Sequence, residues 1–391
     1  MTQFPFDNQR PIDLICMGRV AVDLYAEQIY SPLSKAQTFR CYLGGCAGNI
    51  AVGTSRQGLQ SAMFSCIGQD EMGKFLLNTL RKENVDTTLL RQTPHHLTGL
   101  VILGVNPPDE FPLLFYRENC ADMQITAEDC DPSFFKKAKA LLITGTGFST
   151  ESMRKTSHHA IDLAKPCGTA VIMDLDYRPV LWGLAEKGEG EQRYHASPTV
   201  TAHYQKILPH CDLIVGTEEE IFIASGSDHL QTALQTIRQL THATIVLKRG
   251  EKGCEIYEKD LNQPITGKSY PIQILNVLGA GDAFMSGLLR GWLRKEPWET
   301  CAEYANACGA IVVTRHGCAS AIPNFEEMQY FISHYNKDQN ILSSRAIKRL
   351  HSYSTVGNPA KETLFILAYD HRWQFEKSAM DAGKSISLIK K

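Results

Sequence analysis

The stretch NVLGAGDAF, residues 276–284, places small residues and one carboxylate between two segments of regular pattern. The preceding SYPIQIL, residues 269–275, alternates as a β-strand does, and the following MSGLLRGWL, residues 285–293, has apolar residues at helical spacing. A glycine-rich turn that leads into a helix exposes backbone N–H groups at the positive end of the helix dipole. The stretch therefore predicts a strand, a tight turn and a helix whose first turn holds an anion.

Asp282 stands in the first turn of this predicted helix, directly after Gly279, Ala280 and Gly281. A carboxylate in that position could simply stabilise the helix through its dipole. Beside an anion site, however, the carboxylate would repel the anion unless it had a task, such as taking a proton from an attacking hydroxyl. Position alone leaves both interpretations open.

Apolar runs that alternate with helical patterns indicate the architecture of the rest of the chain. Their breadth suggests strands buried on both faces, and strand–helix–strand repetition is typical of a parallel sheet covered by helices on both sides. The sequence therefore predicts an α/β fold. The predicted strands span residues 140–145, 169–176, 211–216 and 243–250, and the predicted helices include residues 151–165 and 228–240.

Two segments, within about 19–43 and 97–119, have polar residues in strand-like runs and interrupt this alternation. They predict a small antiparallel sheet that projects from the main sheet and covers a pocket as a lid. A peripheral hairpin without a role is the alternative. The polar stretch at 186–200 predicts a long exposed loop.

Composition excludes several classes of partner. The 391 residues include 40 basic and 42 acidic side chains, a balance that argues against nucleic acid or a membrane as the main partner. No apolar run is long enough to span a membrane, and the N-terminus does not resemble a signal peptide, so we expect a cytoplasmic protein. The 12 cysteines show no C-x-x-C pair, which favours reduced thiols over a metal centre or disulfides.

A second glycine cluster, LGGCAGNIAVGTSRQG at 43–58, precedes another helical pattern. Asn49 within it could be an ordinary helix cap or could hold a polar ligand. A third glycine-rich stretch, GQDEMGKF at 68–75, begins like a phosphate-binding P-loop. A P-loop requires Ser or Thr where Phe75 stands, so we set that interpretation aside.

Together, GGCAGNIA and NVLGAGDAFMSGLL resemble the two signatures of the ribokinase-like (pfkB) carbohydrate kinases, and the resemblance runs from residue 12 to about 335. It implies a three-layer α/β/α core with a mostly parallel central sheet and a small β-sheet lid. Within the family, DLDYRPVLWG, GTEEEI and FYRENCAD are most similar to kinases of six-carbon sugar acids. Kinases of a related keto-deoxy sugar acid or of fructose are alternatives.

The resemblance also implies roles for individual residues. Asp282 would deprotonate the sugar hydroxyl, and the N–H groups of Gly279, Ala280 and Gly281 would hold the transferring phosphoryl group. Arg117 on the lid would meet the carboxylate of the substrate. The other implied contacts are Asp23, Gly45 and Asn49 to sugar hydroxyls, Arg178 near the phosphates, Lys248, Gly250 and Gly253 along the nucleotide, and Asn306 near the adenine.

ATP and Mg²⁺ are the cofactors that the resemblance implies, with Glu219 acting on the ion through water. One departure affects this expectation, because Gly216 stands where the family has an asparagine. A monovalent cation and a homo-oligomer stay open.

The predicted domains are a kinase domain at 1–336, a linker at 337–362 and a truncated remnant of an aldolase-like barrel at 363–391. The predicted activity is ATP-dependent phosphorylation of the terminal hydroxyl of a sugar acid. From another class of function, a sugar-binding module that has lost catalysis is the alternative.

Overall fold

A nine-stranded sheet forms the centre of the computed structural model, which describes residues 4–107, 110–338, 340–355 and 372–382. The strand order is β13-β12-β11-β10-β9-β8-β1-β4-β5, and every pair from β11 to β5 is parallel. The parallel strands are β1 (Ile12–Met17), β4 (Ser61–Gly68), β5 (Leu90–Thr93), β8 (Ala138–Thr144), β9 (Ala170–Asp174), β10 (Leu213–Thr217) and β11 (Thr244–Lys248). Two antiparallel strands, β12 (Cys254–Tyr257) and β13 (Ile265–Gly267), complete one edge.

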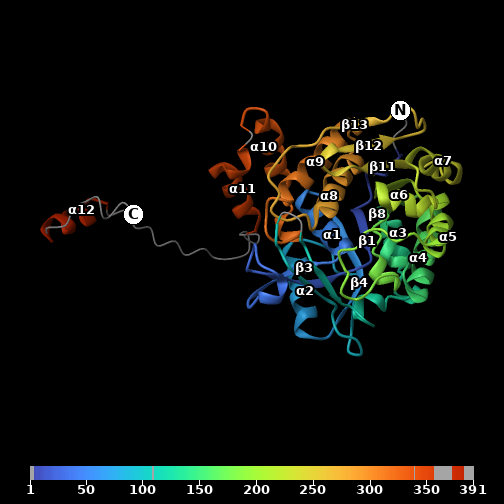
Figure 1. Ribbon diagram of the computed structural model, residues 1–391, viewed down its shortest axis with the longest axis horizontal. Coiled ribbons are helices and arrows are strands. Elements are labelled where there is room, and N and C mark those ends of the chain that lie inside the picture. The colour runs from blue at the N-terminus through green and yellow to red at the C-terminus, as the bar shows by residue number, and fades with distance from the viewer. Residues whose placement is uncertain (1–3, 108–109, 339, 356–371, 383–391) are drawn as a thin grey trace. The chain divides into compact units, whose positions relative to one another are not determined.

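Helices cover both faces of this sheet, as Figure 1 shows. One layer contains α3 (Pro132–Lys136), α4 (Glu151–Ala164), α5 (Pro198–Ile207), α6 (Glu218–Ser225) and α7 (Leu230–Leu240). The other contains α1 (Cys46–Arg56), α2 (Glu71–Lys82), α8 (Ala280–Leu293) and α9 (Trp298–Val312). The predicted three-layer α/β/α core is therefore confirmed.

Alternation along the central strands explains the two layers. In β1, Ile15 and Met17 join the core beneath the first set of helices, whereas Leu14 and Cys16 join the core beneath the second set. Successive side chains of a strand point to opposite faces, so a continuous apolar run fills both cores at once.

The lid is a separate four-stranded sheet of order β3-β2-β6-β7. Its strands are β2 (Ala21–Ala26), β3 (Phe39–Gly44), β6 (Leu100–Leu103) and β7 (Leu113–Tyr116), within the predicted ranges. The expectation of a purely antiparallel sheet is wrong, because β2 and β6 pair in parallel. Buried lid residues such as Tyr25 and Val101 pack against Leu278, just before α8, so the lid lies beside the N-terminus of that helix.

The strand predicted at 269–275 is not present in the structure. These residues run without strand pairing after β13, and the N–H groups of Leu275 and Asn276 donate to the carbonyl of Val313 at 2.8 and 3.0 Å. The aromatic ring of Tyr270 packs against Phe331 at 4.9 Å between centroids. The alternating apolar side chains of 269–275 therefore pack against helices near residue 331, and this segment is not a strand of the sheet.

The prediction of a linker at 337–362 is also wrong for residues 345–355. Residues 345–355 form the helix α11 (Arg345–Thr355), which packs on α10 (Phe325–Tyr335). Ile347 of α11 is 1% exposed, and His351 lies 3.4 Å from Glu327 of α10. Chain contacts divide the molecule into Met1–Thr355 and Val356–Lys391.

In the second unit the structure describes one helix, α12 (Arg372–Asp381). Most of the predicted barrel remnant at 363–391 lies outside the described residues, so that interpretation stays a prediction. Across the described parts of the chain, no helix has the length and apolar character required to cross a membrane.

Candidate active site

A cavity opens where the parallel strands end and is covered by the lid. Ligands of open α/β sheets bind at this carboxyl edge, because the loops that follow the strands converge there. The first turns of α1 and α8 complete the walls. The polar side chains of the lining are those of Arg19, Asp23, Tyr25, Cys46, Asn49, Asp174, Asp176, Tyr177, Arg178, Arg193, Thr217, Glu219, Glu220, Lys248 and Asp282.

Asp282 is the third residue of α8, and the turn before the helix explains its position. Gly279 is the N-cap at φ +80°, and a Cβ added there would lie 2.3 Å from the sulfur of Cys318. Only glycine fits that conformation and that space. The side-chain Nδ2 of Asn49 donates to Oδ2 of Asp282 at 2.7 Å. Burial, reinforced by the negative charge of Asp176, raises the pKa of Asp282 above its ordinary value.

Space for an anion lies between the first turn of α8 and Lys248. The first N–H groups of a helix have no acceptor within the helix, and they point outward from its N-terminus. A Cβ added to Gly281 would lie 3.6 Å from Nζ of Lys248, so the missing side chain leaves room beside this cation. Lys248 pairs with Asp174 at 3.3 Å and Glu220 at 3.6 Å, and these carboxylates raise its pKa despite burial.

Asp23 of β2 and Asn49 of α1 also line the cavity, where the sugar is expected to bind. A Cβ on Gly44 would lie 2.0 Å from the Asp23 carboxyl carbon, so the glycine makes room for that side chain. Burial raises the pKa of Asp23 to about 7. The Oδ1 of Asn49 is buried without a hydrogen-bond partner in the described part of the chain, which leaves it able to accept from a ligand hydroxyl.

The cavity wall contains ion pairs that the sequence analysis did not predict. Arg19 follows β1 and donates from Nη2 to Asp176 at 2.8 Å and from Nε to Thr146 at 3.0 Å. Arg178 lies 3.3 Å from the other oxygen of Asp176. Arg19 lowers the pKa of Asp176 against the effect of burial. The available signal was a charged residue directly after an apolar strand, a position that parallel topology brings to the cavity.

The loop before α5 also contributes to the cavity, although most residues of 186–200 are exposed, as expected. A Cβ on Gly190 would lie 2.1 Å from the carbonyl oxygen of Leu113, so the loop packs closely on the lid. Near the C-terminal end of the loop, the carbonyl of His195 accepts a hydrogen bond from the hydroxyl of Tyr177 at 2.6 Å. Between these contacts, the exposed Arg193 lines the cavity.

Arg117 does not line this cavity. It follows β7, its side chain is 3% exposed, and its guanidinium pairs with the fully buried carboxylate of Asp122. Burial lowers the pKa of Arg117, and Asp122 opposes that effect. The structure therefore pairs Arg117 with a nearby acid in the interior and not with the space expected for a substrate carboxylate.

The other predicted contacts divide into two groups. Gly45, Asn49, Arg178, Glu219 and Lys248 line the cavity with Asp23, Gly279, Gly281 and Asp282, whereas Ala280, Gly250, Gly253 and Asn306 do not. Gly253 serves backbone packing, because a Cβ there would lie 2.0 Å from the carbonyl oxygen of Gly267. Asn306 is buried and donates to the sulfur of Cys254 at 3.4 Å.

Gly216 has a structural explanation. A Cβ at this position of β10 would lie 2.6 Å from Cδ1 of Leu175, so an asparagine would require the Leu175 side chain to move. Thr217 and Glu219 still reach the cavity from the residues that follow.

Comparison with known proteins places this site in a family. Residues 12–324 match the model of the pfkB family of carbohydrate kinases, and residues 327–391 match that of an uncharacterized protein conserved in bacteria, DUF2090. A 5-dehydro-2-deoxygluconokinase from Geobacillus kaustophilus is 31% identical over 341 residues, covering 86% of this chain and 98% of that protein.

Solved structures have the same fold. A protein from E. coli described as a ribokinase II, in complex with ATP and Mg²⁺, has a TM-score of 0.73 at 21% identity, over 83% of this chain and 99% of its own. A fructokinase double mutant from Vibrio cholerae, bound to fructose, ADP and potassium, has a TM-score of 0.70 at 25% identity, over 83% and 100%. The family match extends over most of the described fold and includes both glycine clusters, and the chain therefore belongs to the pfkB family of carbohydrate kinases.

Proposed function

We propose that this chain transfers a phosphoryl group from ATP to the terminal hydroxyl of 5-dehydro-2-deoxygluconate and forms the 6-phosphate, a step of myo-inositol degradation. The observation that carries the proposal is the position of Asp282. Its carboxylate stands at the N-terminus of α8, beside the space between Gly281 and Lys248, and it accepts a hydrogen bond from Asn49 in a cavity that Asp23 also lines. Relatives named 5-dehydro-2-deoxygluconokinase that match across most of the chain support this choice of sugar acid.

The chain's own residues account for the chemistry. Asp282 takes the proton of the sugar hydroxyl as its oxygen bonds to the γ-phosphorus and the bond from that phosphorus to the ADP oxygen breaks. The N–H groups of the first turn of α8 and the Lys248 ammonium stabilise the negative charge that develops on the phosphoryl oxygens. The hydrogen bond from Asn49 holds the Asp282 carboxylate in one orientation.

The donor set of the cavity fits a magnesium ion. The lining includes six carboxylate side chains (Asp23, Asp174, Asp176, Glu219, Glu220 and Asp282) against four cationic ones (Arg19, Arg178, Arg193 and Lys248), before any anionic ligand enters. Mg²⁺ prefers oxygen ligands and keeps several waters, which suits Glu219 acting through water. When bound, the ion supplies charge neutralisation for the phosphates.

Arg193 supports an acidic substrate. Arg19 and Arg178 pair with Asp176, and Lys248 pairs with Asp174 and Glu220, whereas no ion pair among the described residues includes Arg193. We propose that its guanidinium grips the substrate carboxylate, a role that fits its two parallel donors. It takes the place that the sequence assigned to Arg117.

The nucleotide is proposed to extend from Lys248 toward Gly250, where a Cβ would have no neighbour within 4 Å. We do not extend this role to Asn306, whose amide is already engaged inside the protein. The potassium ion bound to the V. cholerae fructokinase motivates a test for a monovalent-cation requirement. Twelve free cysteines fit the reducing cytoplasm, in which we place the reaction.

A substrate panel tests the proposal. ADP release is measured with ATP and Mg²⁺ in the presence of 5-dehydro-2-deoxygluconate, 2-keto-3-deoxygluconate, fructose or ribose, and without sugar. We expect the highest kcat/KM for the first substrate. A higher value for 2-keto-3-deoxygluconate or fructose would reassign the substrate within the family. Sugar binding without sugar-dependent ADP release would identify a module that has lost catalysis.

A further inference from the structure

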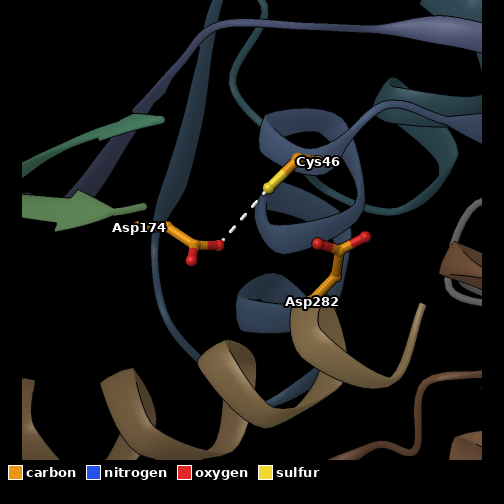
Figure 2. A group of neighbouring side chains, drawn as sticks. All are labelled: Cys46, Asp174 and Asp282. Carbon is orange, nitrogen blue, oxygen red and sulfur yellow. Dashed lines mark hydrogen bonds between the residues drawn. The ribbon is translucent and has the colours of Figure 1, made fainter. Parts of the chain in front are cut away.

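Cys46 lies between two carboxylates of the active site, and the proposed reaction gives it no task. It is the first residue of α1, Asp174 is the last residue of β9, and Asp282 belongs to the first turn of α8. One ligand atom from each side chain lies within 4.8 Å of the other two. Figure 2 shows the thiol pointing into the space between the two carboxyl groups.

From this arrangement we propose that Cys46, Asp174 and Asp282 form a binding site for a thiophilic divalent cation such as Zn²⁺, and that the bound ion inhibits the kinase. The site itself stands on the geometry of the three side chains. Its inhibitory effect rests on the proposed function, because the ion would occupy the carboxylate that must accept the hydroxyl proton.

The spacing is close to what a tetrahedral ion requires. With Zn–S near 2.3 Å and Zn–O near 2.1 Å, tetrahedral angles place neighbouring ligand atoms about 3.4–3.6 Å apart. The Cys46 sulfur is 3.4 Å from Oδ2 of Asp174. The remaining separations are at most 4.8 Å, so they need to shorten by no more than about 1.4 Å, which side-chain rotation can supply. The fourth coordination position of the ion would face the cavity and could be filled by water.

A metal ion can contact more of these three groups than the single thiol proton can. The single thiol proton donates to Asp174 and also lies within reach of Asp282, so one proton serves two carboxylates. A bound Zn²⁺ would displace that proton to solvent and contact all three groups.

The neighbouring groups limit which ion fits. Oδ1 of Asp174 pairs with the Lys248 ammonium, which leaves Oδ2 for a metal. A thiolate and two carboxylates carry three negative charges, which Zn²⁺ and the adjacent lysine together balance. Mg²⁺ prefers octahedral oxygen coordination and does not select a thiolate, so excess Mg²⁺ should compete weakly for this site.

Binding is tested directly by adding Co²⁺ to the full chain that has been dialysed against a chelator. Cobalt takes tetrahedral sites of this kind and gives a near-ultraviolet thiolate-to-metal absorption when sulfur is a ligand. We expect one equivalent of Co²⁺ to produce this band and Zn²⁺ to remove it. Absence of the band in the wild-type chain would overturn the proposal.

Two serine variants show which cysteine sulfur binds the metal ion. Cys318 provides the matched control, because its thiol also donates to Asp282, at 3.8 Å, but it is not part of the three-atom group. Cys46→Ser should lose the band and bind Co²⁺ at least about 100-fold more weakly, since replacing a ligand should cost no less than replacing its outer-shell partner. Cys318→Ser should keep the band. A band that persists in Cys46→Ser, or disappears only in Cys318→Ser, would refute the site.

A third variant tests the site without changing Cys46, in case Cys46→Ser does not fold. Asp174→Asn leaves the thiol in place, and it should require about 10- to 100-fold more Co²⁺ to reach the same band. Wild-type affinity in this variant would exclude the three-ligand site. Kinase assays then separate the two proposals: Zn²⁺ should inhibit in excess Mg²⁺ and a chelator should restore activity. A cobalt band without kinase activity would refute only the proposed function, whereas kinase activity without the band would refute only the site.

Discussion

Replacing Arg193 by glutamine separates recognition of the substrate carboxylate from the rest of sugar binding. The side chain lines the cavity and has no ion pair in the described part of the chain, so the substitution removes a charge without leaving a protein carboxylate unpaired. A hydrogen bond to a charged group contributes about 1.5–3 kcal/mol. Because Arg193 is exposed and partly screened by solvent, we take the lower end of this range, which corresponds to a fall of about tenfold in kcat/KM.

The assay compares a sugar acid with fructose, a neutral sugar, in the same enzyme preparation. Arg193→Gln should lower kcat/KM for the acid about tenfold and leave any fructose activity nearly unchanged, and the acid-specific loss should shrink at high salt. Lys187→Gln is the matched control, because it removes a charge from the same loop at a surface pair with Glu118 and away from the cavity. Equal losses on both sugars, or an equal effect of the control, would remove Arg193 from carboxylate recognition.

Four further outcomes test the site and the fold. Asp282→Asn should keep nucleotide binding but lower kcat by about 10²–10⁴, and near-normal turnover would reduce the carboxylate to a helix-stabilising charge. Because burial raises the pKa of Asp282 and the base must be ionised, kcat/KM should fall as pH decreases through a value above the ordinary range of a carboxyl; an acid limb near pH 4 would contradict this. Arg117→Gln should destabilise the protein by about 3–5 kcal/mol in urea unfolding by leaving Asp122 unpaired, and Asp122→Asn in the same chain should recover part of the loss. Deleting 345–391 should cost about 1.5–3 kcal/mol more than deleting 356–391, because only the longer deletion removes the buried isoleucine of α11, and equal stabilities would show that this helix does not support the fold.

Sequence patterns predicted those elements whose structure depends on neighbouring residues of the chain. Apolar runs bounded by turns predicted the parallel strands β8 to β11, although not β1, β4 and β5. The glycine cluster at 279–281 predicted the start of α8, because only glycine adopts φ +80° against Cys318. The same reasoning failed at 269–275, where alternation marks packing of Tyr270 between helices and not a strand. A two-residue period reports which side chains are buried, not what the backbone pairs with.

Contacts between distant segments were harder to predict. Arg117 and Arg193 each occur in a polar stretch, and nothing local indicates which one reaches the cavity. The difference depends on Asp122, which pairs with Arg117 in the interior, and on Gly190, whose close approach to the lid brings the later loop over the site. Both are consequences of how the lid packs, which one sequence does not specify.

The ion pairs of the cavity wall suggest a role for the many charged side chains at this site. Replacing a buried ion pair by apolar side chains is often neutral or stabilising, so the pair formed by Arg19 and Asp176 is weak evidence for stability. The pair matters because it positions a neighbouring cation. Asp176 is held at φ +23°, and the second oxygen of Asp176 faces Arg178 of the cavity wall. A cation that is already oriented needs no reorganisation when phosphate charge develops, whereas a mobile one must first be ordered. The buried carboxylates therefore act through the cations that they orient, and the selectivity for a substrate carboxylate is left to Arg193, the cavity cation without such a partner among the described residues.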